Sequence, residues 1–449
     1  MRAHSVTKNS RLLTHAVTTA LFLSALATEI SLAASGDLDS SFGAGGVVAL
    51  TINDHAYATA VAVQDDDKIV AAGYSLSGSS GRIAVVRLDA VGDLDAAFGS
   101  AGVVSIPATN QNIGYAVALQ SDANILVAGG EFTGPDGPDY DFRLVRLLAS
   151  DGRLDASFGS GGIVATAAAS RVGAAAIAVQ ADGKILVGGD GNPKPQSTSR
   201  NRDLLVVRYD TDGTLDSTYG VGGKAFVSMG KSHEYLNRLV AQTDGSVLAA
   251  GSAGAKSSWR PVATRLGSAG ALDPTFGSGG RYRGRWLTRR SFLQDAAVLA
   301  DGSILLAGLS VVESAKALPT ASMVLARLAA DGSRDTGFGH NGLAVSTPDA
   351  EAYYHVNRSA VQTDGKVVVA GGVVFGTATD QTSDLLLARF NTDGSLDASF
   401  GSAGVVCAAL SKYDEVWGLA LQDDGKIVVA GVSSADGLHS QMLVARFLP

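Results

Sequence analysis

Short apolar runs alternate with glycine-rich turns along most of the chain, a pattern that predicts β-strands. In one stretch, Ser359–Gln362 leads into a Thr-Asp-Gly turn, and residues 366–370 then read KVVVA. After a variable loop, Leu385–Phe390 is followed by a second Asp-Gly turn, and another apolar run begins at Gly404. β-Branched and aliphatic residues favour strands, and Asp-Gly favours tight hairpin turns. The stretch therefore predicts four antiparallel strands, each about 4–7 residues long.

This unit recurs along the chain. A string close to Leu-Asp-x-x-Phe-Gly occurs seven times, with its aspartates at spacings of 56 to 62 residues. These aspartates are Asp39, Asp95, Asp155, Asp216, Asp273, Asp335 and Asp397. A string close to Gln-x-Asp-Gly-Lys, and an arginine followed by Leu, Tyr or Phe, recur in the same order. Repeats of this period indicate a solenoid, a propeller or an array, and four antiparallel strands per unit favour the propeller.

The two ends of the repeat region are complementary. The last unit stops at Pro449, directly after its third predicted strand, and residues 36–50 supply the missing string and a fourth strand. Pairing of these pieces removes the open sheet edge that a linear stack leaves. We therefore predict an all-β fold, a seven-bladed β-propeller formed by residues 35–449. Each blade has four antiparallel strands, and the N-terminal strand closes the ring by joining the last blade.

Residues 1–34 have the layout of a secretory signal peptide. Met1–Arg11 carries three positive charges, Leu12–Ala27 is apolar, and Ser31–Ser35 offers small residues for cleavage. The alternative is an amphipathic N-terminal helix of a cytosolic protein. No cysteine directly follows the apolar run, and no second run has the length of a membrane span. We expect a secreted or periplasmic protein that is not inserted in a membrane.

Composition and charge exclude several classes of protein. The chain is 46% hydrophobic and only 17% charged, unlike a disordered chain, and its 55 glycines follow no three-residue period, unlike collagen. Seven histidines and the single Cys407 form no cluster typical of a zinc or iron–sulfur site. The formal net charge of −8 disfavours nucleic acid and anionic membranes as partners. We expect a monomer without a cofactor.

The repeated residues suit structural roles. Asp39 and its equivalents can accept hydrogen bonds from the next backbone N–H groups, and the arginine that ends each third strand can pair with that aspartate. The aromatic residue of the string can fill the space between blades. Calcium is an alternative at Asp210, Asp212 and Asp216, which gather oxygen ligands around a glycine. Turn chemistry explains these aspartates without an ion, so we predict no metal site.

The strings resemble those of the delta-60 repeat family, whose units of roughly sixty residues carry G-x-L-D-x-x-F-G and Q-x-D-G-K-I-x-x-A-G motifs. The resemblance covers Gly36–Phe447, and residues 182–189, DGKILVGG, are among its clearest copies. Ala123-Asn124 and Leu299 depart from the motif. The resemblance implies a bacterial β-propeller of largely unknown function, and it implies no catalytic residue.

The loops and the channel mouth are the places where a site is expected. Loops between second and third strands vary strongly, for example Glu131–Asp141, Asp190–Arg202 and Val311–Thr320, and binding residues concentrate on variable loops of a rigid frame. Five positions before each repeated glutamine or its equivalent, the inner strand should enter the channel. These residues are Thr59, Tyr115, Ala175, Asn237, Gln294, Asn357 and Trp417.

Charged and aromatic residues accompany these positions. One position later come Arg238, Asp295 and Arg358, and just outside come His55, His233, Tyr235, Arg290, Phe292, Tyr353, His355 and Glu415. Charges near the axis are costly unless they are paired or hydrated. Together these residues can hold a polar or anionic ligand, such as a glycan or peptide. Alternatively, Arg238, Asp295 and Arg358 pair together and merely fill the channel.

Two functions follow from this set. The first is an exported scaffold that binds a ligand or a protein partner through its variable loops and channel mouth, with Arg238, Asp295, Arg358, Asn237, Gln294, Asn357, Trp417, His233, Tyr235 and His355 as candidate binding residues. The alternative is a lyase or hydrolase that acts on a polar glycan or peptide, with His233, His355, Asp295 and Glu415 as acid/base groups. No nucleophile elbow, zinc signature or phosphate loop supports catalysis, so we predict binding.

Overall fold

The structure is a computed structural model that describes residues 33–449 except 109, 133–139, 168–169, 194–201, 231, 314–318, 350–351 and 378–379. Residues 1–32, which hold nearly all of the predicted signal peptide, lie outside the described residues. The chain divides into two compact units, Met1–Ala33 and Ala34–Pro449. Within the described part of the second unit every regular element is a β-strand, as predicted. No helix long and apolar enough to cross a membrane occurs among the described residues.

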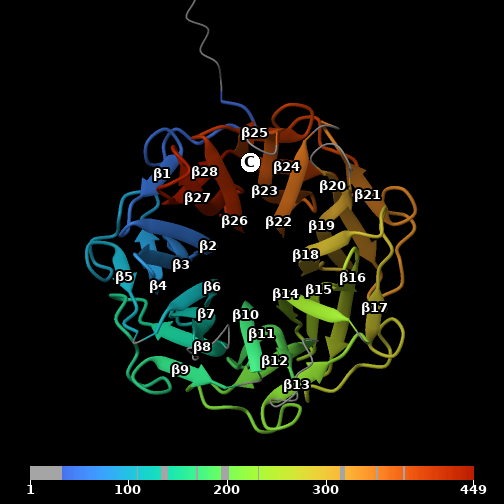
Figure 1. The fold of residues 1–449 in the computed structure, drawn as a ribbon, viewed down its shortest axis with the longest axis horizontal. Helices are drawn as coiled ribbons and strands as arrows, with labels where there is room; N and C mark the ends of the chain where they lie inside the picture. The colour runs from blue at the N-terminus through green and yellow to red at the C-terminus, as the bar shows by residue number, and fades with distance from the viewer. Residues whose placement is uncertain are drawn as a thin grey trace, which may run out of the picture. The chain divides into compact units, whose positions relative to one another are not determined.

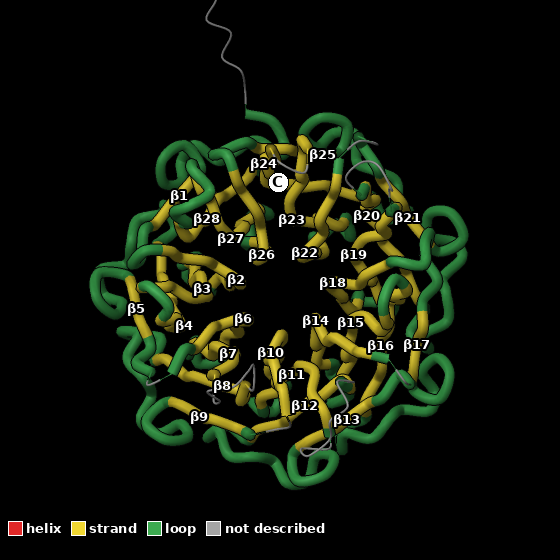
Figure 2. The backbone as a smooth tube through the Cα atoms, in the orientation of Figure 1, coloured by secondary structure: helices red, strands yellow, loops and turns green. Residues whose placement is uncertain are grey.

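The strands of the second unit form four-stranded groups arranged around a central axis (Figures 1 and 2). The strands nearest the axis are β2 (His55–Val63), β6 (Asn112–Leu119), β10 (Ser170–Val179), β14 (His233–Ala241), β18 (Ser291–Val298), β22 (Tyr353–Val361) and β26 (Tyr413–Leu421). The second strands are β3 (Ile69–Ser77), β7 (Ile125–Phe132), β11 (Ile185–Asn192), β15 (Val247–Ala255), β19 (Ile304–Val312), β23 (Val367–Thr377) and β27 (Ile427–Ser434). The third strands are β4 (Ser80–Leu88), β8 (Tyr140–Leu147), β12 (Asp203–Tyr209), β16 (Ser258–Leu266), β20 (Thr320–Leu328), β24 (Asp380–Phe390) and β28 (Gln441–Phe447). The outer strands are β5 (Val103–Ser105), β9 (Ile163–Thr166), β13 (Lys224–Val227), β17 (Arg281–Arg283), β21 (Leu343–Ser346), β25 (Val405–Ala408) and β1 (Val47–Leu50).

Strand pairing follows the chain except at its ends. The sheets β2–β5, β6–β9, β10–β13 and β14–β17 each have their strands in sequence order. The remaining strands form one hydrogen-bonded sheet, in which β20 meets β22 and β24 meets β26 through a single parallel residue pair each. At the chain ends, β1 pairs antiparallel with β28, from Val47 opposite Ala445 to Leu50 opposite Met442.

Strand lengths differ from the sequence prediction. The inner strands run for 8 to 10 residues, longer than predicted, because each begins several residues before its aliphatic run. Several residues predicted to lie in the loops between second and third strands therefore belong to strands instead. Residues 131–132, 140–141, 190–192 and 311–312 belong to strands, and much of what lies between is outside the described residues.

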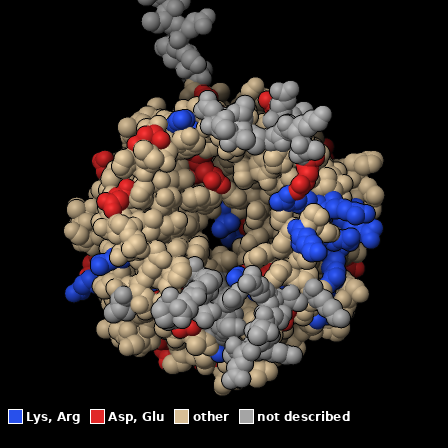
Figure 3. All heavy atoms as spheres, viewed as in Figure 1, with Lys and Arg blue, Asp and Glu red and all other residues tan. Residues whose placement is uncertain are grey.

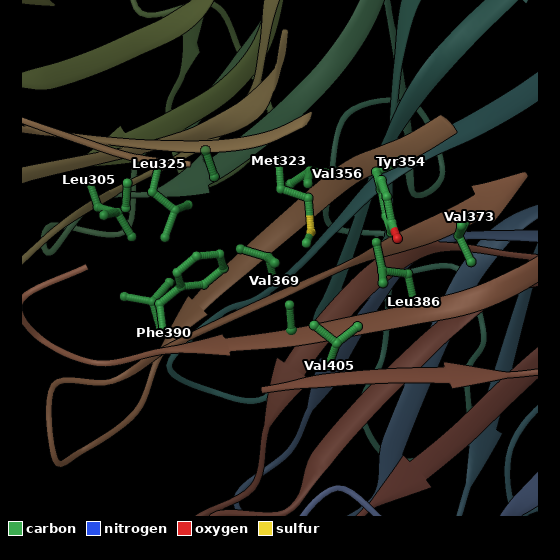
Figure 4. Packing of buried hydrophobic residues seen from close by; sticks show 14 of the residues in the cluster. Leu305, Met323, Leu325, Tyr354, Val356, Val369, Val373, Leu386, Phe390 and Val405 are labelled. Carbon is green, nitrogen blue, oxygen red and sulfur yellow. The ribbon is translucent and has the colours of Figure 1, made fainter. Parts of the chain in front are cut away.

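The core lies between the faces of neighbouring sheets. Figure 4 shows one such layer, in which Leu305 of β19 and Leu325 of β20 pack with Val369 of β23 and Phe390 of β24. Each unit alone has two apolar sheet faces, so stacking against both neighbours is what buries them.

The repeated aspartate and arginine tie the units together, as the sequence predicts. In each string the aspartate Oδ1 accepts the N–H of the residue two positions on, as Asp155 does from Ser157 at 2.9 Å. Its Oδ2 accepts the arginine Nε at 2.5 to 2.9 Å. The pairs are Arg87–Asp95, Arg146–Asp155, Arg208–Asp216, Arg265–Asp273, Arg327–Asp335, Arg389–Asp397 and Arg446–Asp39.

The same arginine also reaches the next unit. Arg146 Nη1, for example, donates to the Thr211 carbonyl at 2.5 Å, and its guanidinium lies 4.4 Å from the centre of the buried Phe158 ring. A cation above an aromatic face is attracted by the ring quadrupole. Each string therefore fixes a turn, fills the space between units and bonds to the neighbouring unit.

Candidate functional site

A β-bulge marks every inner strand where it passes the axis. Near the axis, the antiparallel register of each inner strand skips one residue, so that two residues of the strand oppose one of the second strand; β10 has a further irregularity between Ser170 and Gly173. The residues skipped near the axis are Thr59, Tyr115, Ala175, Asn237, Gln294, Asn357 and Trp417. A bulge bends the strand and re-aims the extra side chain. The seven positions counted back from the repeated glutamine are therefore the seven bulged residues.

All seven bulged residues line one cavity. Its volume is about 320 Å³, and the lining is completed by Tyr74 from β3 and Arg358 from β22. The cavity belongs to the hollow at the centre of the space-filling view, where blue cationic atoms are visible (Figure 3). Ligand pockets typically have this size and combine apolar walls with a few polar groups. We call this site the central cavity.

One side of the central cavity is aromatic. The Tyr57 ring stacks on Tyr74 with centroids 4.7 Å apart and lies 6.1 Å from the Trp417 ring. Burial, with Tyr57 and Tyr115 nearby, raises the pKa of Tyr74 to about 12. The Tyr74 hydroxyl therefore stays neutral at physiological pH. These rings provide flat apolar faces beside hydroxyl groups.

Amide side chains form the other side. Asn237 Nδ2 donates to the Leu293 carbonyl at 2.6 Å and to Gln294 Oε1 at 3.1 Å. Asn357 Nδ2 donates to the Val416 carbonyl at 2.8 Å and to Glu415 Oε1 at 3.2 Å. Each asparagine thus bonds the bulge of the next unit, as Thr59 Oγ1 does with the Gly114 carbonyl at 3.0 Å. These bonds fix the amide orientations before any ligand arrives.

Of the three charges at the axis, Asp295 and Arg238 form an ion pair, which is part of the network expected as the alternative to ligand binding. Asp295 Oδ2 accepts the backbone N–H and the hydroxyl of Ser359 at 2.6 and 3.0 Å. Its Oδ1 lies 3.2 Å from Arg238 Nε, whereas Arg358 Nη1 donates to the Asn357 carbonyl at 2.8 Å. The Ser359 bonds hold the carboxylate against β22, where it pairs with Arg238 and its charge also acts on the Arg358 guanidinium.

Arg358 is the cation that faces the central cavity. Burial lowers the pKa of its guanidinium, the Asp295 carboxylate opposes this, and Arg238 adds to it. Arginine nevertheless stays protonated in proteins. With two guanidinium groups for one carboxylate, this side of the cavity favours an anion.

Five predicted site residues do not line the central cavity. Arg238 and Asp295 lie beside it as an ion pair, and His233, Tyr235 and His355 lie elsewhere. Tyr235 stacks on Trp259 with centroids 5.3 Å apart, and Trp259 stacks on Phe292 at 5.7 Å. His355 lies 4.5 Å from the Tyr353 ring, in a separate cavity of about 190 Å³.

The proposed acid/base set is brought together only in part. Burial lowers the pKa of His355, and the Glu415 carboxylate, which is close enough to interact with it, opposes that shift. Asp295 instead faces Ser359, and His233 begins a different inner strand.

Sequence reasoning missed Tyr57 and Tyr74. Tyr57 lies two residues before the bulged Thr59, so alternation along a strand could have suggested it. Tyr74 directly follows the Ala-Gly of its repeat, where the other units have Gly130, Asp190, Ser252, Leu309, Gly372 and Val432. An aromatic residue at this otherwise variable position was the available signal.

The oxygen-rich turns considered for calcium are occupied by protein donors. Asp212 Oδ1 accepts the N–H and hydroxyl of Thr214 at 2.9 and 2.7 Å. Lys184 Nζ lies 2.7 Å from both Asp210 and Asp216. Across the described part of the chain, no group of three or more His, Cys, Asp or Glu side chains is placed to hold a metal ion.

Comparison with known families agrees with the repeat pattern. The model of a β-propeller family described as a domain of unknown function, DUF5122, matches residues 64–98, 120–158, 180–219, 242–276, 299–338 and 362–400. Together these segments cover about half of the chain. The chain belongs to the DUF5122 β-propeller family. Each matched segment of this DUF5122 protein runs from the repeated glutamine or its equivalent to the aromatic residue of the next string.

Several solved structures are similar to this chain at low sequence identity. The polysaccharide lyase Uly1 matches with a TM-score of 0.50 and 10% identity, covering 87% of this chain and 90% of that one. A polysaccharide lyase described as PL25 ulvan lyase matches at 0.46 and 9% identity, covering 93% and 95%. Sqt1 from Chaetomium thermophilum matches at 0.43 and 10% identity, covering 89% and 97%. No curated protein matches the sequence.

Proposed function

We propose that this DUF5122 protein is a binding scaffold whose central cavity holds a small polar ligand with a ring face and an anionic group. The observation that carries the proposal is the construction of the cavity. Bulged residues from all the inner strands meet there, with aromatic rings on one side and amides plus Arg358 on the other. A sugar acid fits this chemistry, because its ring can stack on Trp417 or Tyr74 and its carboxylate can pair with Arg358.

The scaffold in this proposal is a seven-bladed ring closed by β1. Support comes from the pairing of β1 with β28 and from the bond between Arg446 Nε and Asp39 Oδ2 at 2.8 Å. Residues of β2 and β3 also share a buried cluster with residues of β27 and β28. Closure matters for function, because Trp417 and Thr59 come from opposite ends of the chain and line the same cavity.

Export of the protein is part of the same proposal. It rests on the positive charges of Met1–Arg11 and the apolar run Leu12–Ala27. A secreted or periplasmic scaffold meets glycans and peptides outside the cytoplasm, which suits the ligand classes expected from the cavity.

Screening the chain on an array of glycans and peptides, followed by titration of the strongest hit, tests the proposal. Trp417→Ala should weaken binding at least about tenfold through loss of stacking area, and Arg358→Ala should do so through loss of the cation. Val221→Ala and Arg82→Ala serve as matched controls, because both side chains are exposed and neither lines the cavity. Unchanged binding by both cavity variants contradicts the proposal.

A second candidate is an enzyme that acts on a polar glycan or peptide. The interaction of His355 with Glu415 favours it, since a histidine with a lowered pKa is neutral at pH 7 and can accept a proton. His355→Ala should then abolish turnover and leave binding intact. Absence of turnover across a panel of acidic and neutral glycans and peptides contradicts this candidate.

A further inference from the structure

An arginine-rich segment contrasts with the acidic character of the whole chain. Residues 281–290 read RYRGRWLTRR, whereas the formal net charge of the chain is −8. Figure 3 shows Lys and Arg atoms gathered in one broad area at the right, beside the central hollow. Arg260 of β16, Arg285 and Arg289 line one groove of about 430 Å³. We call this site the arginine groove.

The arginines of the groove differ from the repeated arginines of the propeller. Arg260, Arg285 and Arg289 are exposed, and none of them forms an ion pair with a carboxylate among the described residues. The repeated arginines, by contrast, are each bound to an aspartate. Arg290, the next residue, pairs with Glu313 and is thereby neutralised. Three cations therefore face one concavity without a partner, and their mutual repulsion is relieved only by solvent or a ligand.

Backbone hydrogen bonds hold the groove in place. Trp259 N–H donates to the Arg289 carbonyl at 2.8 Å, and Gly284 N–H donates to the Pro261 carbonyl at 2.8 Å. Thr288 Oγ1 donates to the Arg290 carbonyl at 3.0 Å. The loop that carries Arg285 and Arg289 is thus fixed against β16, which lowers the ordering cost of binding.

We propose that the arginine groove binds an acidic polysaccharide, a chain of sugar rings that carry carboxylates or sulfates. A guanidinium presents a planar fork of donors that matches such oxyanions, and the groove has arginines with no lysine among its lining residues. Trp259 lies at the same groove and stacks on Tyr235, which places aromatic faces along the path of a sugar chain. The proposal does not depend on ligand binding in the central cavity.

Two other polyanions fit the surface less well. A lipid bilayer presents a flat sheet of headgroups, whereas these arginines line a concave groove. Duplex nucleic acid carries one charge per about 1.7 Å over a long rod, so it extends beyond the groove onto a chain that is acidic overall. A flexible chain with separated charges can follow the groove alone.

Titration of the full chain with a polygalacturonate oligomer and a heparin-derived oligosaccharide tests the proposal, with uncharged dextran as the control ligand. Replacing Arg260, Arg285 and Arg289 together by glutamine should weaken binding of the preferred oligomer at least about tenfold. Replacing them by lysine should still weaken it about threefold, because the charge remains and the planar fork is lost. A matched variant that changes Arg82, Arg153 and Lys412 to glutamine removes the same charge elsewhere and should bind within about twofold of the parent.

These binding measurements give results that either support or overturn the proposed groove. Loss of binding in the glutamine variant and a smaller loss in the lysine variant, with binding retained in the matched variant and unchanged melting temperatures, support the groove. The proposal is overturned by equal loss in the matched variant, equal binding of dextran, no binding of either acidic oligomer, or unchanged binding in the lysine variant. Binding of oligothymidylate or phosphatidylglycerol vesicles in place of the acidic oligomers also overturns it. Trp417→Ala should leave groove binding intact, which distinguishes failure of this proposal from failure of the central cavity.

Discussion

Positive backbone φ angles at particular turn residues set local stability. The Gln-x-Asp-Gly turn needs the left-handed region at its fourth position, and Gly183 adopts it with φ of 83°. The second repeated unit has Ala123 at this position, with φ of 62°. An alanine Cβ is unfavourable there, whereas glycine is not.

Ala123→Gly should therefore stabilise the protein by up to about 1 kcal/mol, less the entropy that glycine adds to the unfolded chain. Chemical denaturation measures this difference. Gly183→Ala at the equivalent turn is the reverse substitution and should destabilise the protein. If both variants shift stability in the same direction, the φ argument is wrong.

One buried carboxyl group gives stability a distinctive pH dependence. Glu234 of β14 is fully buried, and burial raises its pKa to about 7, although Oε1 accepts the Met229 N–H at 2.7 Å. A raised pKa means that the folded state binds the proton more tightly than the unfolded state. The contribution of Glu234 to the free energy of unfolding is therefore fully present below about pH 4.5 and is lost as the pH rises through about 7.

Glu234→Gln should remove this part of the pH dependence. Melting temperatures measured from pH 4.5 to 8 should fall less steeply for the variant than for the parent, by an amount that corresponds to about 1–3 kcal/mol over the range. The difference between the two curves isolates Glu234 from other groups that titrate in this window. Parallel curves contradict the raised pKa.

At the level of the strand, the bulge explains the glycine of the repeated Ala-Gly pair. A Cβ on Gly308 would lie 2.0 Å from the Phe292 carbonyl oxygen, and one on Gly251 would lie 1.9 Å from that of Tyr235. No real contact is that short. A residue larger than glycine therefore cannot occupy this position of the second strand while the neighbouring inner strand keeps its bulge. The glycine is therefore a requirement of the bulge that turns a side chain toward the axis.

Gly308→Ala should destabilise the protein by more than about 2 kcal/mol, because a clash with backbone cannot be relieved by a rotamer change. Denaturant unfolding is the appropriate measurement. Gly267→Ala is the control, since a Cβ there meets only the Ala271 carbonyl at 3.8 Å and Gly267 has no positive φ. Similar losses in both variants contradict the steric argument.

The sequence predicts the strands, the repeat and the seven positions at the channel, because all three recur at a fixed place relative to the repeated glutamine. It does not predict that these positions are bulged, since the alternation of side chains in the sequence does not reveal an extra residue in the strand. It also does not predict that Asp295 binds Ser359 of the next inner strand. Contacts between units depend on the angle at which the sheets pack, and no local pattern records that angle.

At the scale of the whole molecule, the central cavity depends on elements that are far apart in the chain. Thr59, Asn237 and Trp417 line it together although they belong to the first, a middle and the last inner strand. Their approach depends on contacts between neighbouring groups of strands, including those of β2 with β26 (Figure 1). In this account the N-terminal segment 34–50 has a central role, since it completes the sheet of β26–β28.

The most direct test removes residues 34–50 and supplies them again as a separate peptide. Thermal unfolding followed by circular dichroism should show that the shortened chain has lost its cooperative transition near the parent temperature, because β28 then exposes an unpaired edge and Asp39 no longer holds Arg446. Adding the synthetic peptide 34–50 should restore the transition, and a scrambled peptide should not. A shortened chain that unfolds at the same temperature as the parent, with no response to the peptide, contradicts closure of the ring by β1.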